Sequence, residues 1–305
     1  MNNNAVAFCV TGPHLQLTAV AITSILQHYH HESPLKILVV CGNVQQPDIE
    51  YIRTLPEKHN KPMVTIDFWG KPAAWINDIK PYYMKDQDSI APSVLFWRMF
   101  LPAYYPTYEK ILYLDNDVIV NTDVTNLFEA LDDNHTLAAV SDFLFAASKN
   151  YDPAVQSSED ALRAHGLKNL RFYFNDGVMV MNVARYNQRF SVEKIVSLIN
   201  DASWNLPDQT LMNIMFQGDT KLLSYRYNYQ HSLEYFDEPY NWDPKLIRPI
   251  LDAYQHIAIR HFASDGPLST PYAHVSIHDA WEATFWRLLN QVKMDSMTEA
   301  DNYYA

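Results

Sequence analysis

The feature that most constrains the fold is a stretch near the middle of the chain, residues 111–120 (ILYLDNDVIV). It begins with apolar residues that show no helical period, as in a strand buried on both faces of a sheet. This strand ends at an acidic triplet that contains Asp115 and Asp117. Open α/β sheets bind ligands at the carboxyl ends of their strands, and residues two apart on a strand share a face. The two carboxylates are therefore placed to bind one divalent cation.

The Asp-Asn-Asp triplet also has an ordinary explanation. Asp is common in turns because its carboxylate accepts hydrogen bonds from backbone N–H groups. The apolar strand directly before the triplet favours a binding site, but so short a motif is only a hypothesis. Both interpretations stay open until the rest of the chain is considered.

The first 70 residues alternate between strand-like and helical segments. Strands are predicted at 5–10, 36–41 and 62–68, with a helix over 15–29 and another that opens at Pro47. This alternation predicts an α/β domain with a mostly parallel central sheet and flanking helices.

A helix predicted over 93–100 is apolar nearly all round, and Arg98 is its only charge. A buried guanidinium needs an anion as a partner. That partner is either a carboxylate of the protein or a substrate phosphate.

A strand predicted over 172–182 (FYFNDGVMVMN) is interrupted by Asn175, Asp176 and Gly177. Glycine within a strand indicates a bulge or the close approach of another group to the backbone. The polar side chains beside it can form hydrogen bonds at that point.

The remaining segments are predicted less sharply. Residues 69–91 and 143–168 lack a clear period and are expected to be long loops. A late strand over 255–262 contains His261, and an amphipathic helix beginning near Trp281 is expected to pack on the domain rather than lie on a membrane. Two further helices are expected over 192–200, capped by Ser191, and from Pro207, where Asp208 in the first turn suits the positive helix end.

Composition excludes several classes of partner. The net charge of −12 argues against nucleic-acid binding and against electrostatic docking on anionic lipid. No apolar run is long enough to form a transmembrane segment. Cys9 and Cys41 are expected to be buried free thiols, which indicates a reducing compartment. A cytoplasmic location is therefore expected, with peripheral attachment at the inner face of a membrane left open.

Four motifs follow one another in order: the acidic triplet after ILYL, FNDGVMVMN at 174–182, PDQTLMN at 207–213 and HF at 261–262. Over roughly the first 265 residues this set resembles glycosyltransferase family 8, which includes glycogenin and lipopolysaccharide α-galactosyl and α-glucosyltransferases. The resemblance implies a nucleotide-sugar-binding domain of the GT-A type over 1–270, with a C-terminal amphipathic helix and tail over 271–305. It also implies a retaining enzyme that usually uses manganese.

Carried over to this chain, the resemblance makes Asp115, Asp117 and His261 the metal ligands. Two carboxylates and an imidazole suit Mn²⁺ better than Mg²⁺, which prefers oxygen ligands alone. The metal would bridge the diphosphate of a UDP-sugar and stabilise the leaving UDP.

The resemblance also assigns the residues that would contact the donor sugar. Arg98 would contact the donor sugar or phosphate, Asn175 would hydrogen-bond the sugar, and Gln209 would lie on the face opposite the leaving group. The implied catalytic residues are Gln209, Asp208 and Asp176, and the implied donor-binding residues are Arg98, Asn116, Asn175, Gly177, Asp208, Phe8 and Thr11.

The chain departs from the family pattern at three places, one of which is Asp176, where the family usually has a small residue after the asparagine. Thr11, Gly12 and Pro13 occupy a turn where the family commonly has acidic and Asn residues that hold uridine. The family's lysine on the diphosphate has no counterpart between His261 and Tyr272.

The expected activity is transfer of a hexose from UDP to a hydroxyl of a carbohydrate, glycolipid or glycoprotein acceptor, with an α linkage. Gln209 is a poor nucleophile, so we expect departure and attack on one face of the sugar rather than a double displacement. Two alternatives are a non-catalytic sugar- or nucleotide-binding relative and a phosphatase of the haloacid dehalogenase type. The phosphatase requires a further acidic pair, and the sequence shows no convincing one.

Overall fold

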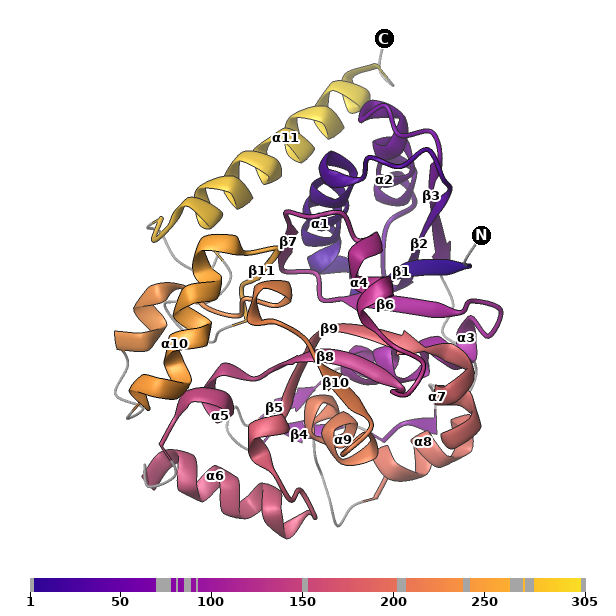
Figure 1. The fold of residues 1–305 in the computed structure, drawn as a ribbon. Coiled ribbons are helices and arrows are strands. Elements are labelled where there is room, and N and C mark those ends of the chain that lie inside the picture. Colours follow the sequence, from indigo (N-terminus) through magenta and orange to yellow (C-terminus); the bar gives the residue numbers. More distant parts are fainter. Residues whose placement is uncertain are drawn as a thin grey trace.

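The computed structural model describes residues 3–69, 78–80, 82–84, 89–91, 93–149, 153–201, 207–237, 242–263, 271 and 277–302. A seven-stranded sheet forms the centre of the molecule, in the order β10-β8-β9-β6-β1-β2-β3 (Figure 1). Its strands are β1 (Asn4–Thr11), β2 (Leu35–Gly42), β3 (Val64–Trp69), β6 (Lys110–Leu114), β8 (Leu137–Ser141), β9 (Phe174–Asn182) and β10 (Thr220–Leu222). Only β9 runs antiparallel to its neighbours, β6 and β8. The predicted α/β fold with a mostly parallel sheet is confirmed.

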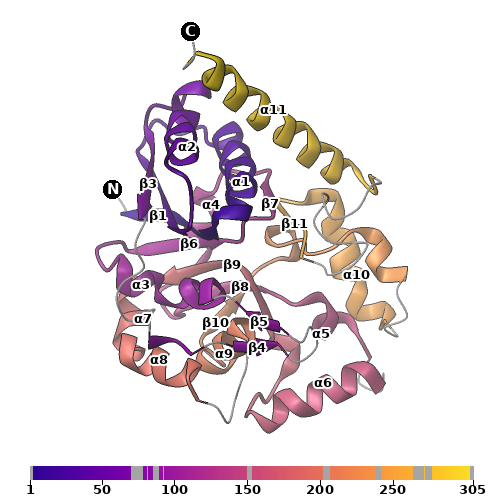
Figure 2. The same cartoon turned by 180° about the vertical axis from the view of Figure 1, so that it is seen from behind.

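Helices cover both faces of this sheet (Figures 1 and 2). The α-helices are α1 (Leu15–His28), α2 (Gln46–Lys58), α3 (Leu101–Tyr104), α4 (Thr125–Ala130), α5 (Phe143–Ala147), α6 (Pro153–Ala164), α7 (Val183–Arg189), α8 (Val192–Ile199), α9 (Asp208–Met215), α10 (Pro244–Ala253) and α11 (Ala280–Asn302). One core layer joins α1, α2, α4 and α11 to the sheet, and a second joins α3, α7, α8 and α9.

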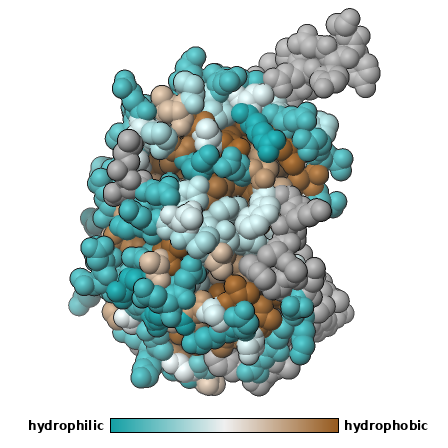
Figure 3. Space-filling view, turned by 90° about the vertical axis from the view of Figure 1, so that its right-hand side faces the viewer, coloured by the Kyte–Doolittle hydropathy of each residue, from teal (hydrophilic) through white to brown (hydrophobic). Residues whose placement is uncertain are grey.

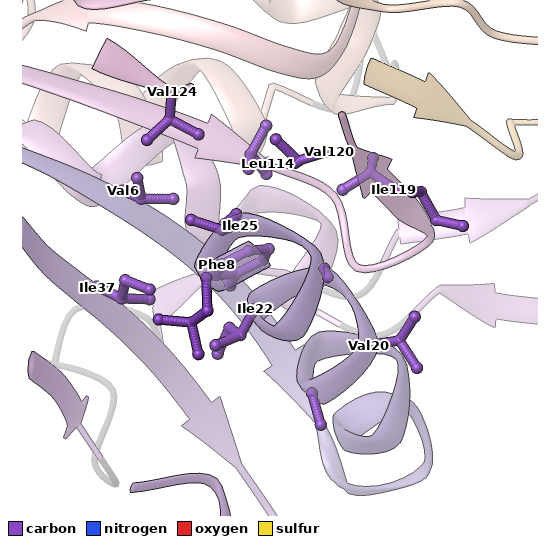
Figure 4. Close-up of a cluster of buried hydrophobic side chains, with 14 of the residues drawn as sticks. Val6, Phe8, Val20, Ile22, Ile25, Ile37, Leu114, Ile119, Val120 and Val124 are labelled. Atoms are coloured by element: carbon purple, nitrogen blue, oxygen red, sulfur yellow. The ribbon is translucent and has the colours of Figure 1, made fainter. Parts of the chain in front are cut away.

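Successive residues of β1 face opposite layers, as the strand period requires. Phe8 is fully buried beside Ile22 and Ile37 in the layer that holds α1 (Figure 4). Ala7 and Cys9 belong to the other layer, which contains the 3-10 helix Ser93–Phe100. Because both faces are covered by apolar side chains, the strand is hydrophobic throughout.

The acidic triplet lies in a turn rather than in a strand. Strand β6 ends at Leu114, and the chain resumes as β7 (Val118–Val120) after the turn. The late strand β11 (Ile259–His261) is shorter than predicted and pairs antiparallel with β7. This two-stranded sheet brings the end of β11 to the carboxyl end of β6 (Figure 1).

Residues 143–168 were expected to form a loop, and this was wrong. They contain α5, whose first turn is capped by Asp142, and the more polar helix α6. The residues of 69–91 that are described include an antiparallel pair, β4 (Tyr82–Met84) and β5 (Ser89–Ala91); the others lie outside the described residues. Residues 93–100 form a 3-10 helix that continues into α3, where Pro102 occupies the first turn.

The C-terminal helix α11 contributes buried side chains to one of the core layers. Phe285, Leu288, Leu289 and Val292 of α11 are buried in the same core layer as α1. None of the helices within the described residues has the length and apolar character that crossing a membrane would need. On the face seen in Figure 3, apolar side chains gather in separate patches between hydrophilic ones.

Candidate active site

Three side chains that bind metals in many proteins meet where β7 and β11 pair. His261 is the register partner of Val118, and the backbone N–H of Phe262 donates to the carbonyl of Asp117 at 3.0 Å. His261 Nε2 lies 3.3 Å from Asp117 Oδ1 and 3.6 Å from Asp115 Oδ2. One ligand atom from each of the three lies within 4.8 Å of the others. The predicted metal ligands are therefore brought together.

The donor atoms fit a divalent cation. Two carboxylate oxygens and one imidazole nitrogen suit Mn²⁺, and Mg²⁺ less well. His261 is almost fully buried, whereas Asp115 and Asp117 remain partly open to solvent, so the site is reachable from outside. Clusters of acids close together repel one another, and a bound cation removes that cost.

Gly177 explains how the three ligands can approach so closely. The register between β8 and β9 shifts between Ala139 and Val140, which is a bulge opposite this glycine. The carbonyl of Gly177 accepts from the backbone N–H of Asp115 at 2.8 Å. A Cβ at position 177 would lie 2.3 Å from His261 Cε1. The prediction of a bulge or a close approach at this glycine is confirmed on both points.

Arg98 is surrounded by three carboxylates. Nη2 lies 3.0 Å from Asp115 Oδ1, Nη1 lies 3.0 Å from Asp176 Oδ1, and Nε lies 3.0 Å from Asp208 Oδ2. The guanidinium also lies over the ring of Tyr113, 4.7 Å from its centroid. The anion partners of this buried charge are carboxylates of the protein itself. Arg98 therefore holds Asp115, a predicted metal ligand, and two further acids in fixed positions.

The charges of this cluster move the pKa values in opposite directions. Burial alone would raise the pKa of Asp115, but Arg98 and His261 outweigh it and the pKa is lowered. Burial raises the pKa of Asp176 well above its usual range, because the opposing charge of Arg98 does not compensate and Asp208 adds to the rise. Asp115 is therefore kept ionised, whereas Asp176 holds its proton more tightly.

Gln209 lies at the first turn of α9, beside the strand that carries Asn175. Its Oε1 accepts from Asn175 Nδ2 at 3.1 Å, and its Nε2 donates to Asp142 Oδ2 at 3.4 Å. Asn175 Oδ1 in turn accepts from Asn228 Nδ2 at 2.8 Å. Neither Asp142 nor Asn228 was predicted from the sequence. Asn228 stands in an aromatic stretch without a period, where no signal distinguishes it.

Some of the residues assigned to the donor line a cavity, and one lies in the core. Thr11 and Asn116 line a cavity of about 300 Å³ that also borders Asp115 and Asp117. The amide of Asn116 donates to the carbonyl of Cys9 at 3.0 Å, so it also ties the acidic turn to β1. Phe8 faces the core beneath α1, and its assignment to the donor is wrong (Figure 4). In the stretch between His261 and Tyr272, where the family lysine has no counterpart, residues 264–270 lie outside the described residues.

Comparisons with known proteins identify the family of this chain. The model of Glycosyl transferase family 8 matches residues 5–265. Lipopolysaccharide 1,2-glucosyltransferase of Escherichia coli is 26% identical over 215 residues, which cover 69% of this chain and 58% of that protein. Glycosyltransferase GlyE of Streptococcus pneumoniae serotype 4 is 25% identical over 236 residues, which cover 76% of this chain and 49% of that protein. The chain thus spans about half the length of the curated relatives it matches.

Among solved structures, the galactosyltransferase LgtC in complex with donor and acceptor sugar analogues has a similar fold. The TM-score is 0.69 at 19% identity, and the match covers 94% of this chain and 95% of the other. The fold is accordingly of the GT-A type, and a phosphatase of the haloacid dehalogenase type is excluded. The chain belongs to Glycosyl transferase family 8.

Proposed function

We propose that this protein is a metal-dependent, retaining glycosyltransferase that moves a hexose from a UDP-sugar to an acceptor hydroxyl, forming an α linkage. The observation that carries the proposal is the meeting of Asp115, Asp117 and His261, which come from distant parts of the chain, beside an open cavity. Such a meeting is not expected of a turn whose carboxylates only accept backbone N–H groups.

The three ligands would hold Mn²⁺, or Mg²⁺, next to the cavity lined by Thr11 and Asn116, which we propose holds the nucleotide. When bound, the cation supplies positive charge that stabilises the diphosphate leaving group. Arg98 lies 3.0 Å from both Asp208 Oδ2 and Asp176 Oδ1, so these side chains are held rigidly where sugar hydroxyls can hydrogen-bond to them.

The bond changes follow from the described side chains at the site, none of which is a suitable nucleophile. Gln209 is uncharged, and its amide is engaged by Asn175 and Asp142. Asp176 and Asp208 are both paired with Arg98. We therefore propose that the bond from the anomeric carbon to UDP breaks with its electron pair on the phosphate oxygen. The acceptor oxygen bonds to that carbon on the same face and gives its proton to the departing phosphate.

The acceptor is proposed to be a carbohydrate, glycolipid or glycoprotein. The relative from Escherichia coli is named for lipopolysaccharide, and that name agrees with a carbohydrate-bearing acceptor. The compartment is proposed to be the cytoplasm, because Cys9 and Cys41 are both buried free thiols.

A second candidate is a relative that binds the nucleotide sugar without transfer. Thr11 lines the cavity at a position where the family commonly has a residue that holds uridine. A site can lose chemistry while the fold persists.

The test is release of UDP from UDP-glucose, UDP-galactose and UDP-N-acetylglucosamine with Mn²⁺, using wild type and Asp117→Asn. We expect release from at least one donor and its loss in the variant. Asp252→Asn changes an exposed carboxylate on α10 and serves as the matched control. Binding of UDP without release from any donor would support the second candidate, and absence of both would overturn the two together.

A further inference from the structure

A continuous chain of hydrogen bonds runs from the metal-binding imidazole to a carboxylate. His261 Nδ1 lies 3.0 Å from Asn228 Oδ1, and Asn228 Nδ2 donates to Asn175 Oδ1 at 2.8 Å. Asn175 Nδ2 donates to Gln209 Oε1 at 3.1 Å, and Gln209 Nε2 donates to Asp142 Oδ2 at 3.4 Å. We call the three residues Asn228, Asn175 and Gln209 the amide chain.

The direction of the amide chain is set by the backbone. The N–H group of Gly177 donates to Asn175 Oδ1 at 3.1 Å, and the N–H group of Asp176 lies 3.4 Å from Gln209 Oε1. These contacts fix which end of each amide is the oxygen. Asn175 must then present its oxygen to Asn228, because its Nδ2 is used elsewhere. An oxygen can only accept, so the neighbouring amide must donate through its own nitrogen.

The orientation of the Asn228 amide determines which nitrogen of the His261 imidazole carries a proton. Because Asn228 uses its nitrogen for Asn175, it can offer only its oxygen to His261. A carbonyl oxygen accepts, so the imidazole must carry its proton on Nδ1. In the neutral imidazole the other ring nitrogen, Nε2, then has a lone pair directed at Asp117 and Asp115, 3.3 and 3.6 Å away.

We propose that Asn228 is a positioning residue that holds His261 in the Nδ1–H tautomer and so makes Nε2 available to a divalent cation. This deepens the proposed function, since it rests on a metal at the same three ligands. The amide chain also connects the tautomer of His261 to the orientation of Gln209, because Asn175 is hydrogen-bonded to both Asn228 and Gln209.

The side chain at 228 suits this role for two reasons. It is completely buried, so a water molecule does not take its place in these hydrogen bonds. Asparagine supplies one acceptor and one donor without adding a charge. A carboxylate there would still accept from His261 but would face Asn175 Oδ1, another acceptor, which is unfavourable.

The first experiment measures binding of Mn²⁺ alone, by electron paramagnetic resonance of the free ion, with no sugar donor present. Asn228→Ala removes the acceptor, and we expect the affinity to fall about 10- to 100-fold, as for other groups that orient a ligand histidine. Asn228→Asp keeps the acceptor and is expected to retain most of the affinity. Thermal unfolding of each variant verifies that it is folded.

The second experiment reads the tautomer directly. Long-range proton–nitrogen NMR spectra of metal-free protein distinguish Nδ1–H from Nε2–H, and the His261 signals are assigned by their loss in His261→Ala. We expect Nδ1–H in wild type and in Asn228→Asp, and a shift toward Nε2–H in Asn228→Ala. A side chain with a purely structural role would not move the proton. Should Asn228→Ala not fold, a change of tautomer in Asn228→Asp would still overturn the proposal.

Asn213 is the matched control. It is also a buried asparagine, on α9, and its side chain hydrogen-bonds to the backbone of Phe174 and of Gln209 instead of to His261. We expect Asn213→Ala to lower the unfolding temperature and to leave both the Mn²⁺ affinity and the tautomer unchanged. The proposal is overturned if Asn228→Ala binds Mn²⁺ like wild type, or if both variants lose affinity equally. Neither readout uses a donor, so a failure to release UDP would count against the proposed function alone.

Discussion

The backbone of Gly177 lies directly against the imidazole of His261. A Cβ added at this glycine would stand 2.3 Å from Cε1 of the ring and 2.6 Å from Asp115 Oδ2. Neither neighbour can move away easily, because the ring is hydrogen-bonded to Asn228 and the carboxylate forms an ion pair with Arg98. The three proposed metal ligands can therefore meet only if position 177 carries no side chain.

Gly177→Ala should accordingly damage the metal site more than the fold. Forcing a methyl group into this space costs about 1–3 kcal/mol of stability, and displacement of the ring should weaken Mn²⁺ binding by about tenfold or more. Isothermal titration with Mn²⁺ and urea unfolding measure the two effects. Gly218→Asn is the control: it lies at a positive φ of 79° that Asn tolerates and has nothing within 4 Å. An alanine variant with wild-type affinity would contradict the packing described for Gly177.

Asp176→Asn should stabilise the protein increasingly as the pH rises. Burial raises the pKa of Asp176 well above its usual range, so the folded state holds this proton more tightly than the unfolded state. Its stabilising contribution is complete below the unfolded pKa of about 4 and is lost as the pH rises through the folded pKa. Asn has no proton to lose. The gain in free energy of unfolding should therefore grow toward alkaline pH.

Urea unfolding of metal-free wild type and variant between about pH 5 and pH 8 measures this difference. Asp252→Asn, on the exposed face of α10, should show no such trend. If Asp176→Asn lost stability relative to wild type as the pH rose, the ionised carboxylate would have to be the stabilising form.

Much of this arrangement was predictable because it rests on local patterns. The strand and helix periods predicted the sheet, and the resemblance to glycosyltransferase family 8, carried by four motifs in order, assigned Asp115, Asp117 and His261 as metal ligands. The glycine was informative because a strand interior otherwise disfavours it. Each of these inferences depends on residues near one another in sequence or on a motif in order.

The errors have physical causes. Phe8 and Cys9 sit on opposite faces of β1, but both faces are apolar, so the sequence period does not tell which side a residue takes. Helix α6 (Pro153–Ala164) was missed because its large apolar residues, Val155 and Leu162, are too few to show a helical period. Asn228 reaches His261 only through tertiary structure, since Tyr229 and Arg260 pair as isolated bridge partners. Nothing in the local pattern reports that pairing.

Gln209→Ala should reduce turnover without abolishing it. The side chain is proposed to orient the sugar face and not to form a covalent bond, so losing one oriented amide should cost about 10²-fold at most. The measurement is single-turnover release of UDP, together with mass spectrometry of quenched enzyme. Complete loss of activity with a glycosyl adduct on Asp176 or Asp208 would contradict same-face transfer and indicate a double displacement. Gln217→Ala, on the surface beyond the end of α9, is the control.

Leu288→Ala tests whether α11 is part of the domain or an appendage. Leu288 is almost fully buried in the core layer that contains α1, so truncation should cost about 2–5 kcal/mol of stability. Asn290 lies two residues further on the same helix and is exposed, and Asn290→Ala should change stability by less than about 0.5 kcal/mol. Urea unfolding followed by both tryptophan fluorescence and circular dichroism distinguishes the two cases. If α11 shares one core with the sheet, both probes should report a single transition that shifts as a whole in Leu288→Ala. A separate early transition, with the main one unmoved, would show that 271–305 folds independently of the catalytic domain.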